Sequence, residues 1–317
     1  MDLTFDSVLR AFEITGSAAK GFDNHVFTCQ AYDPTLDAIT QFARLIDANE
    51  QPPRIRSVII QGDTTTIGSG EDPRPFFWHG SACICSQVFS PDHGYINRIY
   101  VSNTDKWIVL IPPKGVNPGK NWAPFVRDEE LYFVHEYAPF RVLKARFVSP
   151  HDGFLLLDIV AEHAVTTPTS GDGYSQFRGG TNALQIGNKI VGIGHTNEWR
   201  GSTKESIVHR PFLFVYQPEI RVDYYAFDFD FPKRFKIIDP TSFYERDGAL
   251  YLVTCETETV WSTVPQNGRS CLYLVDIENI LDKDGIGSRG RRLHGWAHGE
   301  APQKQRFLGA WRRPKAS

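Results

Sequence analysis

The sequence has no long apolar run. No window approaches the roughly 18 consecutive apolar residues that a membrane-spanning helix requires. Its opening, MDLTFDSVLRAFEI, lacks the basic start and unbroken apolar core of a secretory signal. We therefore expect a protein without a membrane span that works in the cytoplasm.

Cysteine and excess positive charge are both scarce. Five cysteines, an odd number in 317 residues, fit buried thiols in a reducing compartment better than a disulfide framework. Cys83 and Cys85 stand two apart in an apolar run, so on a strand they would share a face as small buried side chains. The formal net charge of -3 gives no basic field for a nucleic acid. The basic stretch 285–317 is expected to be a solvated, flexible tail, with an anionic partner as the alternative.

Several catalytic motifs are also absent. The sequence has no Gly-rich phosphate loop, no Gly-x-Ser-x-Gly elbow and no His-Glu-x-x-His helix. Nucleotide hydrolysis, serine esterase chemistry and zinc protease chemistry therefore have no local support. A metal at Cys83 and Cys85 would need two further ligands that the sequence does not indicate, so we expect neither a metal nor an organic cofactor.

What the sequence does contain is a segment that recurs four times with different residues. Each copy opens on polar or Pro-containing residues, runs into a short apolar stretch, turns near Gly or Asp, and returns through a more apolar stretch. The copies span residues 71–85, 120–136, 178–195 and 238–256. Their starts lie roughly 50 to 60 residues apart, and repeats of about this length are typical of propellers and solenoids.

Each copy is typical of a β-hairpin. The returning runs are short and rich in β-branched and aromatic residues, and helical periodicity is nearly absent. The expected two-residue turns are His79-Gly80, Asp128-Glu129, Gly187-Asn188 and Asp247-Gly248. No linker divides the chain. We predict one all-β domain over residues 1–317, a five-bladed β-propeller with a central funnel, completed by the chain before residue 65 and after residue 260.

The polar openings of the repeats are the expected functional positions. In a propeller the loops that lead into the innermost strands line one end of the funnel. The openings contribute Asp72, Arg74, Lys120, Asn121, Arg178 and Asp239. We expect these side chains to face one shared cavity.

Three of these segments resemble a known enzyme family. Gly70-Glu71-Asp72-Pro73-Arg74, with Asn97-Arg98-Ile99-Tyr100 downstream, resembles the second-blade signature of five-bladed propeller glycosidases, especially glycoside hydrolase family 130. Residues 120–143 are similar to the third-blade pattern of that family, and residues 177–195 to its Gly-rich strand ending in a histidine. The family contains mannoside phosphorylases and β-mannosidases, and the resemblance covers roughly residues 55–275.

The resemblance implies cleavage of a β-mannoside by an inverting route. Such a reaction needs a protonated acid at the leaving oxygen, and a carboxylate-activated water or a bound phosphate on the opposite face. The resemblance makes Asp72 the acid, with Arg74 orienting it or contacting the substrate. Asp239 is our first choice for the second carboxylate, because its Asp-Pro opening repeats that of Asp72. Glu136 and Glu256, each at the end of a strand, are the competing choices.

The resemblance also suggests which residues bind the ligand. Asn97, Arg98, Lys120 and His195 occupy positions similar to phosphate and subsite contacts of the family. Asn121 and Arg178 belong to the polar openings, and Trp122 and Trp199 adjoin them, where an indole can stack on a sugar ring. We expect an oligosaccharide or glycoside substrate, with inorganic phosphate as the candidate co-substrate.

Two other functions remain open. The last repeat ends in Thr254-Cys255-Glu256, where mannoside phosphorylases typically carry Ala-Ala-Asp, so a propeller glycosyltransferase with a phosphorylated sugar donor is one alternative. A non-catalytic glycan-binding propeller is the other, since a fold alone does not establish catalysis. That protein would hold Asp72 in a buried salt bridge and would lack a second carboxylate across the funnel.

Overall fold

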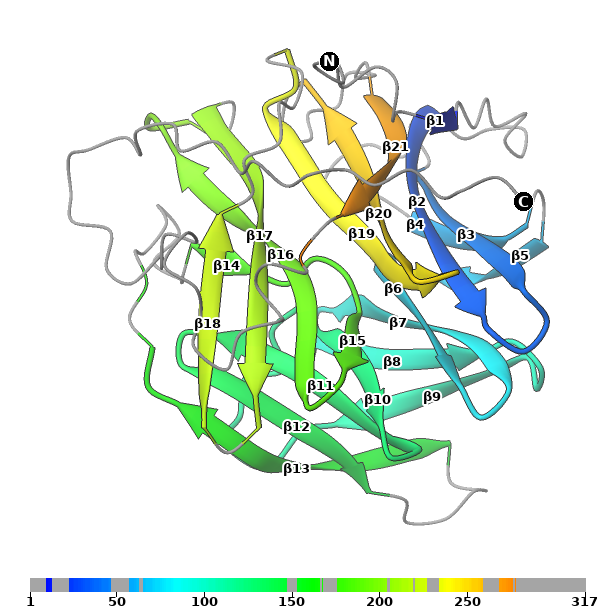
Figure 1. The fold of residues 1–317 in the computed structure, drawn as a ribbon, viewed down its shortest axis with the longest axis vertical. Helices are drawn as coiled ribbons and strands as arrows, with labels where there is room; N and C mark the ends of the chain where they lie inside the picture. Colours follow the sequence, from blue (N-terminus) through cyan, green and yellow to red (C-terminus); the bar gives the residue numbers. More distant parts are fainter. Residues whose placement is uncertain are drawn as a thin grey trace.

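The computed structural model of the chain is a ring of β-sheets (Figure 1). It describes residues 10–12, 23–46, 57–62, 65–146, 153–165, 167, 176–203, 206–218, 220–226, 234–258, 268–275 and 277. Over these ranges the chain forms 21 strands. Within the same ranges no helix has the length and apolarity that crossing a membrane requires. The all-β class predicted from the sequence is confirmed.

The strands form five blades. One sheet of four strands makes a single blade, and sheets of eight and nine strands each hold two adjoining blades. A short parallel pairing of β13 (Phe154–His163) with β9 (Lys106–Ile111) joins the second and third blades along the chain. A parallel bridge between β17 (Ile207–Gln217) and β19 (Ile237–Arg246) joins the fourth and fifth. The fold is therefore the five-bladed β-propeller that the repeats predict.

The blades follow one another along the chain. Blade I consists of β2 (Asp23–Asp33), β3 (Ala38–Ile46), β4 (Ser57–Gln61) and β5 (Thr65–Ser69). Blade II consists of β6 (Glu71–Trp78), β7 (Ser81–Ser90), β8 (Gly94–Val101) and β9 (Lys106–Ile111). Blade III consists of β10 (Ala123–Arg127), β11 (Glu130–Tyr137), β12 (Phe140–Arg146) and β13 (Phe154–His163). Blade IV consists of β14 (Phe177–Arg178), β15 (Ala183–Ile186), β16 (Lys189–Trp199), β17 (Ile207–Gln217) and β18 (Arg221–Ala226). Blade V consists of β19 (Ile237–Arg246), β20 (Ala249–Thr257), β21 (Gly268–Val275) and β1 (Arg10–Phe12).

The four repeats are the two innermost strands of blades II to V. All four turns fall where the sequence predicts them. Asp128 and Glu129 adopt φ angles of 52° and 64°, and Asp247 adopts 53°. Positive φ at these positions matches the right-handed twist of the flanking strands, which is why two residues suffice for each turn.

The ring closes by pairing the two ends of the described chain. Strand β1 lies antiparallel to β21, with Arg10 opposite Leu272 and Phe12 opposite Ser270. The first strand thus completes the last blade. This agrees with the prediction that the chain before residue 65 and after residue 260 completes the propeller.

The core lies between neighbouring blades. Phe76, Cys83, Cys85, Trp122 and Phe133 belong to one buried cluster between blades II and III. All five cysteines are free thiols, and Cys83 and Cys85 are at most 2% exposed. The prediction of structural, buried cysteines at these two positions is confirmed.

Buried polar contacts join the inner strands of neighbouring blades. Thr241 Oγ1 donates to the Thr28 carbonyl at 2.6 Å, and Asn182 Nδ2 donates to the Phe243 carbonyl at 2.7 Å. The Gln30 amide donates to Ser242 Oγ at 2.7 Å. These contacts connect β2 of blade I, and the residue before β15 of blade IV, to β19 of blade V.

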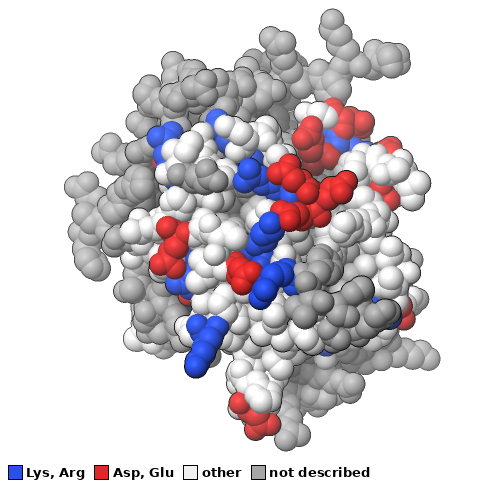
Figure 2. All heavy atoms as spheres, turned by 90° about the horizontal axis from the view of Figure 1, so that it is seen from below, with Lys and Arg blue, Asp and Glu red and all other residues white. Residues whose placement is uncertain are grey.

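Seen from below, the surface carries both signs of charge close together (Figure 2). On β11 to β13, Arg141 pairs with Glu162, and Arg146 pairs with Asp158. Among the described residues of this face, Lys and Arg thus lie beside Asp and Glu rather than in a patch of one sign. The basic stretch 285–317 lies outside the described residues.

Candidate active site

A cavity of about 320 Å³ opens on the axis, at the end where the inner strands begin. Every blade contributes to it. Its lining residues are Phe27, Arg44, Glu71, Asp72, Arg74, Lys120, Asn121, Arg178, His195, Asn197, Ile207, His209 and Asp239. The structure thus brings together all six residues of the polar openings, and it adds His195.

Asp72 sits at a strained bend in β6. The register of β6 against β7 shifts between Glu71 and Arg74, and Asp72 has a φ of 47° within this bulge. Bulges of this kind redirect a side chain and are common beside active sites. The carboxylate forms a close ion pair with Arg44 of β3, and its other oxygen accepts a hydrogen bond from Gln87 Nε2 at 3.3 Å.

Asp72 is held in its charged form. Burial alone would raise the pKa of this carboxyl, but the guanidinium groups of Arg44 and Arg74 and the ammonium of Lys120 outweigh it. The net effect is a pKa below the ordinary value, although the charge of Asp239 opposes the decrease. The carboxylate is therefore ionised near neutral pH when no ligand is bound.

Asp239 lines the same cavity beside two histidines. Its Oδ1 is 2.7 Å from His209 Nδ1 and 3.9 Å from His195 Nε2. The two imidazole rings lie 4.6 Å apart between centroids. These three side chains come from β16, β17 and β19, at the junction of blades IV and V.

Burial acts on the pKa values of both His195 and Asp239. It lowers the pKa of His195 to about 3, so this imidazole is neutral at neutral pH. Burial would raise the pKa of Asp239, but His209, His195 and Arg74 hold it well below the ordinary value. The cavity thus contains two ionised carboxylates, Asp72 and Asp239, close enough to influence each other.

Four cationic side chains line the same cavity. Arg44, Arg74, Lys120 and Arg178 come from blades I, II, III and IV. Arg74 is 2% exposed and donates to the Pro240 carbonyl at 3.3 Å. Lys120 Nζ lies 5.2 Å from the centroid of the Tyr95 ring. Burial lowers the pKa of Lys120, but Asp72, Tyr95 and Glu71 raise it more, so this amine remains charged.

Asn121 is fixed by a close approach of two blades. Its φ is 64°, and its Oδ1 accepts a hydrogen bond from Gln87 Nε2 at 3.4 Å. A Cβ at Gly179 would lie 1.6 Å from the Asn121 carbonyl oxygen. Only glycine fits at residue 179, and this fit places the Lys120 segment beside the Arg178 segment.

Three residues that the sequence predicts as ligand contacts make contacts within the protein instead: Asn97, Arg98 and Trp122. Asn97 Nδ2 donates to the carbonyls of Pro118 and Gly119, at 3.1 and 3.3 Å. Arg98 donates to the Ser69 carbonyl, and its guanidinium lies 3.9 Å from the centroid of the Trp107 ring. Trp122 is 1% exposed in the core, and its Nε1 donates to Pro118. None of the three lines the cavity, and two of them hold the loop that presents Lys120.

The competing carboxylates and Trp199 also lie outside the cavity. Glu136 pairs with Arg141 at 2.6 Å on β11 and β12. Glu256 is fully buried and accepts hydrogen bonds from Thr254 and Tyr273. Asp239 is the one alternative that shares the cavity with Asp72.

Sequence reasoning missed Arg44 and His209. Both lie on strands of otherwise apolar character, AITQFARLI and IVHRPFLFVYQ. A charged or titratable residue within such a strand is the available signal, because it needs a partner when the strand is buried. Neither strand belongs to the repeated inner hairpins, so attention to the openings alone could not find them.

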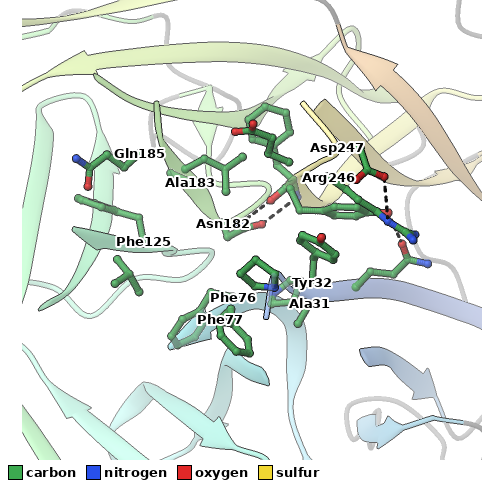
Figure 3. A pocket seen from close by; sticks show the side chains of 18 residues that line it. Ala31, Tyr32, Phe76, Phe77, Phe125, Asn182, Ala183, Gln185, Arg246 and Asp247 are labelled. Atoms are coloured by element: carbon green, nitrogen blue, oxygen red, sulfur yellow. Dashed lines mark hydrogen bonds and ion pairs between the residues drawn. The ribbon is translucent and has the colours of Figure 1, made fainter. Parts of the chain in front are cut away.

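A second cavity of about 470 Å³ lies at the other end of the inner strands. Aromatic side chains, including Tyr32, Phe76, Phe77 and Phe125, surround it (Figure 3). Arg246 lies at this cavity and pairs with Asp37 at 2.8 Å. Gln30 and Asn182, whose buried hydrogen bonds reach β19, also line this cavity.

Comparison with solved structures finds the same fold elsewhere. A hypothetical protein from Leishmania major has a TM-score of 0.51 and 14% identity, over 84% of this chain and 90% of its own. An α-L-arabinanase from Cellvibrio cellulosa, complexed with arabinohexaose, has a TM-score of 0.49 and 12% identity, over 86% and 96%. A third structure has a TM-score of 0.49 and 11% identity, over 79% of this chain and 84% of its own. Its description states that the GH130 family of mannoside phosphorylases contains glycoside hydrolases that target β-1,2-mannosidic linkages in Candida mannan. No protein-family model and no curated protein matches the sequence. At these identities the similarity concerns the fold alone.

Proposed function

We propose that this chain is a carbohydrate-active enzyme that cleaves or transfers a glycosidic bond in the charged axial cavity. The substrate class is a β-mannoside, and a phosphate group is the attacking species. One observation carries the proposal: four cationic side chains and two ionised carboxylates, Asp72 and Asp239, from five blades line a single cavity. The family 130 resemblance of the segments that bear Asp72, Lys120 and Arg178 supports the sugar class.

The cations favour an anionic ligand. The lining contains three carboxylates and four cationic side chains, those of Arg44, Arg74, Lys120 and Arg178. A phosphate in a partly dry site needs several converging donors, and guanidinium groups supply them in a fixed planar arrangement. Phosphorolysis therefore suits this cavity better than hydrolysis by water alone.

The ion pair of Asp72 sets a condition on catalysis. A general acid must be protonated when it acts, whereas Arg44 stabilises the charged form of Asp72. A bound sugar would have to separate the two groups, or a sugar hydroxyl would have to relay the proton. In either case Asp72 becomes an acid only in the complex.

A glycan-binding propeller is the second candidate. The ion pair between Asp72 and Arg44 favours it, because an acid locked in a salt bridge is typical of a binding site. Asp239 in the same cavity argues against it, since a second ionised carboxylate has no necessary role in neutral sugar binding. A glycosyltransferase with a phosphorylated donor would use the same cations.

A product assay distinguishes these functions. The purified chain is incubated with a panel of β-linked manno-oligosaccharides, with and without inorganic phosphate, alongside Asp72→Asn and the exposed control Asp158→Asn. We expect phosphate-dependent release of mannose 1-phosphate by the wild type and the control, and loss of this release in Asp72→Asn. Release without phosphate would establish a hydrolase. If the chain turns over only a nucleotide sugar, it is a transferase. If it turns over no substrate but binds a glycan measurably, it is a glycan-binding propeller.

A further inference from the structure

One wall of the charged cavity carries a group of metal-binding side chains. His195 on β16, His209 on β17 and Asp239 on β19 each offer one donor atom, and these atoms all lie within 4.8 Å of one another. Among the described residues this is the group with the composition of a two-histidine, one-carboxylate site. That set is common in proteins that bind zinc or iron.

The backbone fixes the three positions. On the ladder of β16 and β17, His209 lies opposite Asn197, two residues from His195, so the histidines are diagonal neighbours on one face. A parallel bridge pairs His209 with Ile237 of β19, two residues before Asp239. The donors therefore come from three hydrogen-bonded strands rather than from a loop.

Small side-chain movements would suffice to bind an ion. Asp239 Oδ1 is 2.7 Å from His209 Nδ1 and 3.9 Å from His195 Nε2. Ligand bonds to zinc are about 2.0–2.2 Å, so donors in a tetrahedron around it lie about 3.3–3.5 Å apart. The two distances bracket that spacing. His195 Nδ1 is buried without a hydrogen-bond partner in the described chain, so no hydrogen bond at this nitrogen holds the ring against a small movement toward the ion.

The surroundings select the kind of metal. Arg74 and Arg178 line the same cavity and repel any cation held by charge alone. Calcium and magnesium depend on several carboxylate or carbonyl oxygens, and this group supplies a single carboxylate. A borderline ion such as Zn²⁺ gains most of its affinity from imidazole nitrogen, so it tolerates these arginines better.

We propose that His195, His209 and Asp239 bind one divalent transition-metal ion of the zinc type, with a fourth coordination position open to the cavity. This position would accept water or an anionic oxygen of a ligand. The site does not depend on the glycosidic chemistry proposed above. When the ion is bound, Asp239 acts as a ligand rather than as a general base.

The proposal differs from the sequence-based expectation of no metal. That expectation considered cysteines and local spacing, whereas these ligands lie on three strands of two blades. Only the ring geometry brings residues 195, 209 and 239 together.

Zinc titration of the full chain tests the proposal. The protein is treated with a chelator and dialysed, and Zn²⁺ binding is then followed by calorimetry, with Co²⁺ absorption as a probe of tetrahedral coordination. His209→Gln and Asp239→Asn remove one ligand each. His93→Gln, at an exposed turn, is the matched control. Thermal unfolding confirms that each variant folds, and His195→Gln replaces either variant that does not.

We expect one equivalent of Zn²⁺ in the wild type and in His93→Gln, and an affinity at least about tenfold lower in both ligand variants. A tetrahedral Co²⁺ spectrum should disappear with them. Absence of stoichiometric binding would overturn the proposal, as would equal affinity in the wild type and the ligand variants. Displacement of Zn²⁺ by equal concentrations of Ca²⁺ would overturn the assignment of the metal type. None of these results depends on turnover of a sugar.

Discussion

The guanidinium of Arg44 and the carboxylate of Asp72 form an ion pair that connects blade I to blade II at the rim of the charged cavity. The side chains are 9% and 17% exposed, so water screens the pair only weakly. The same carboxylate is the candidate acid of the proposed reaction. Stability and function therefore depend on one contact.

Replacing Asp72 by Asn should destabilise the protein near neutral pH. Removing one partner of a buried ion pair typically costs about 3 kcal/mol. The exposed control Asp158→Asn, which loses only its contact with Arg146, should cost less than about 1 kcal/mol. Urea unfolding measures both, and similar small losses would show that the pair contributes nothing to folding.

The same variant should alter the dependence of stability on pH. The pKa of Asp72 is lower in the folded chain than its ordinary value, so its contribution is present above the unfolded pKa of about 3.9 and is lost as pH falls through the folded pKa. The variant Asp72→Asn should lack the part of the decrease in unfolding free energy at acid pH that comes from protonation of Asp72. Unfolding free energies compared from neutral pH down to about pH 3 provide the measurement. Parallel curves for wild type and variant would contradict the depressed pKa.

Gly179→Ala should be severely destabilising. The new Cβ would lie 1.6 Å from a backbone oxygen of Asn121, which cannot move without separating two blades. We expect a loss of about 3 kcal/mol or more. Gly201→Ala is the matched control, because its Cβ would approach the Ser206 side chain no closer than 3.1 Å. Thermal unfolding curves that coincide for the two variants would contradict the close approach.

The inner hairpins were predictable because their signal is local. The turn Asp247-Gly248 and the alternation on either side of it are encoded in a few neighbouring residues. Blade I gave no such signal. Its turn spans residues 34–37, and the cavity residue on its first strand is the apolar Phe27 rather than a polar opening.

The site was predictable in part for the same reason. Asp72 and Asp239 were found because an Asp-Pro opening repeats, and a repeated opening occupies an equivalent place in each blade. Arg44 comes from blade I, which holds no copy of the repeat, and His209 comes from a strand outside the repeated hairpin of blade IV. The family resemblance predicts that Asn97 contacts the ligand, yet its amide donates to the loop carbonyls of Pro118 and Gly119. A polar residue near a site can either touch the ligand or hold the chain that does, and only the geometry separates the two.

Asn97→Ala should therefore lower stability. Its amide satisfies two carbonyl oxygens and is 1% exposed, so its removal should cost about 1–3 kcal/mol. Asn188→Ala, at an exposed turn, should change stability by less than about 0.5 kcal/mol. Chemical unfolding gives both values. An unchanged stability combined with weaker ligand binding would restore Asn97 as a ligand contact.

Removal of β1 should weaken the closure of the ring. A chain lacking residues 1–12 loses the three pairs with β21 and exposes that strand as an edge. We expect a loss of about 2–3 kcal/mol, at about 1 kcal/mol per lost hydrogen bond, and a tendency to associate. A chain lacking only residues 1–8 keeps β1 and serves as the control. Equal melting temperatures and equal elution volumes for the two truncations would contradict this closure.

Calorimetric titration with mannose 1-phosphate tests the central claim most directly, namely that the charged cavity binds an anionic saccharide. The titration compares the wild type with Lys120→Met, which removes a cation from this cavity, and Arg246→Met, which removes one from the aromatic cavity at the other end of the axis. We predict one binding site, weakened about tenfold by Lys120→Met, which corresponds to about 1.4 kcal/mol, and unchanged by Arg246→Met. No binding by the wild type, or a loss confined to Arg246→Met, would contradict the account.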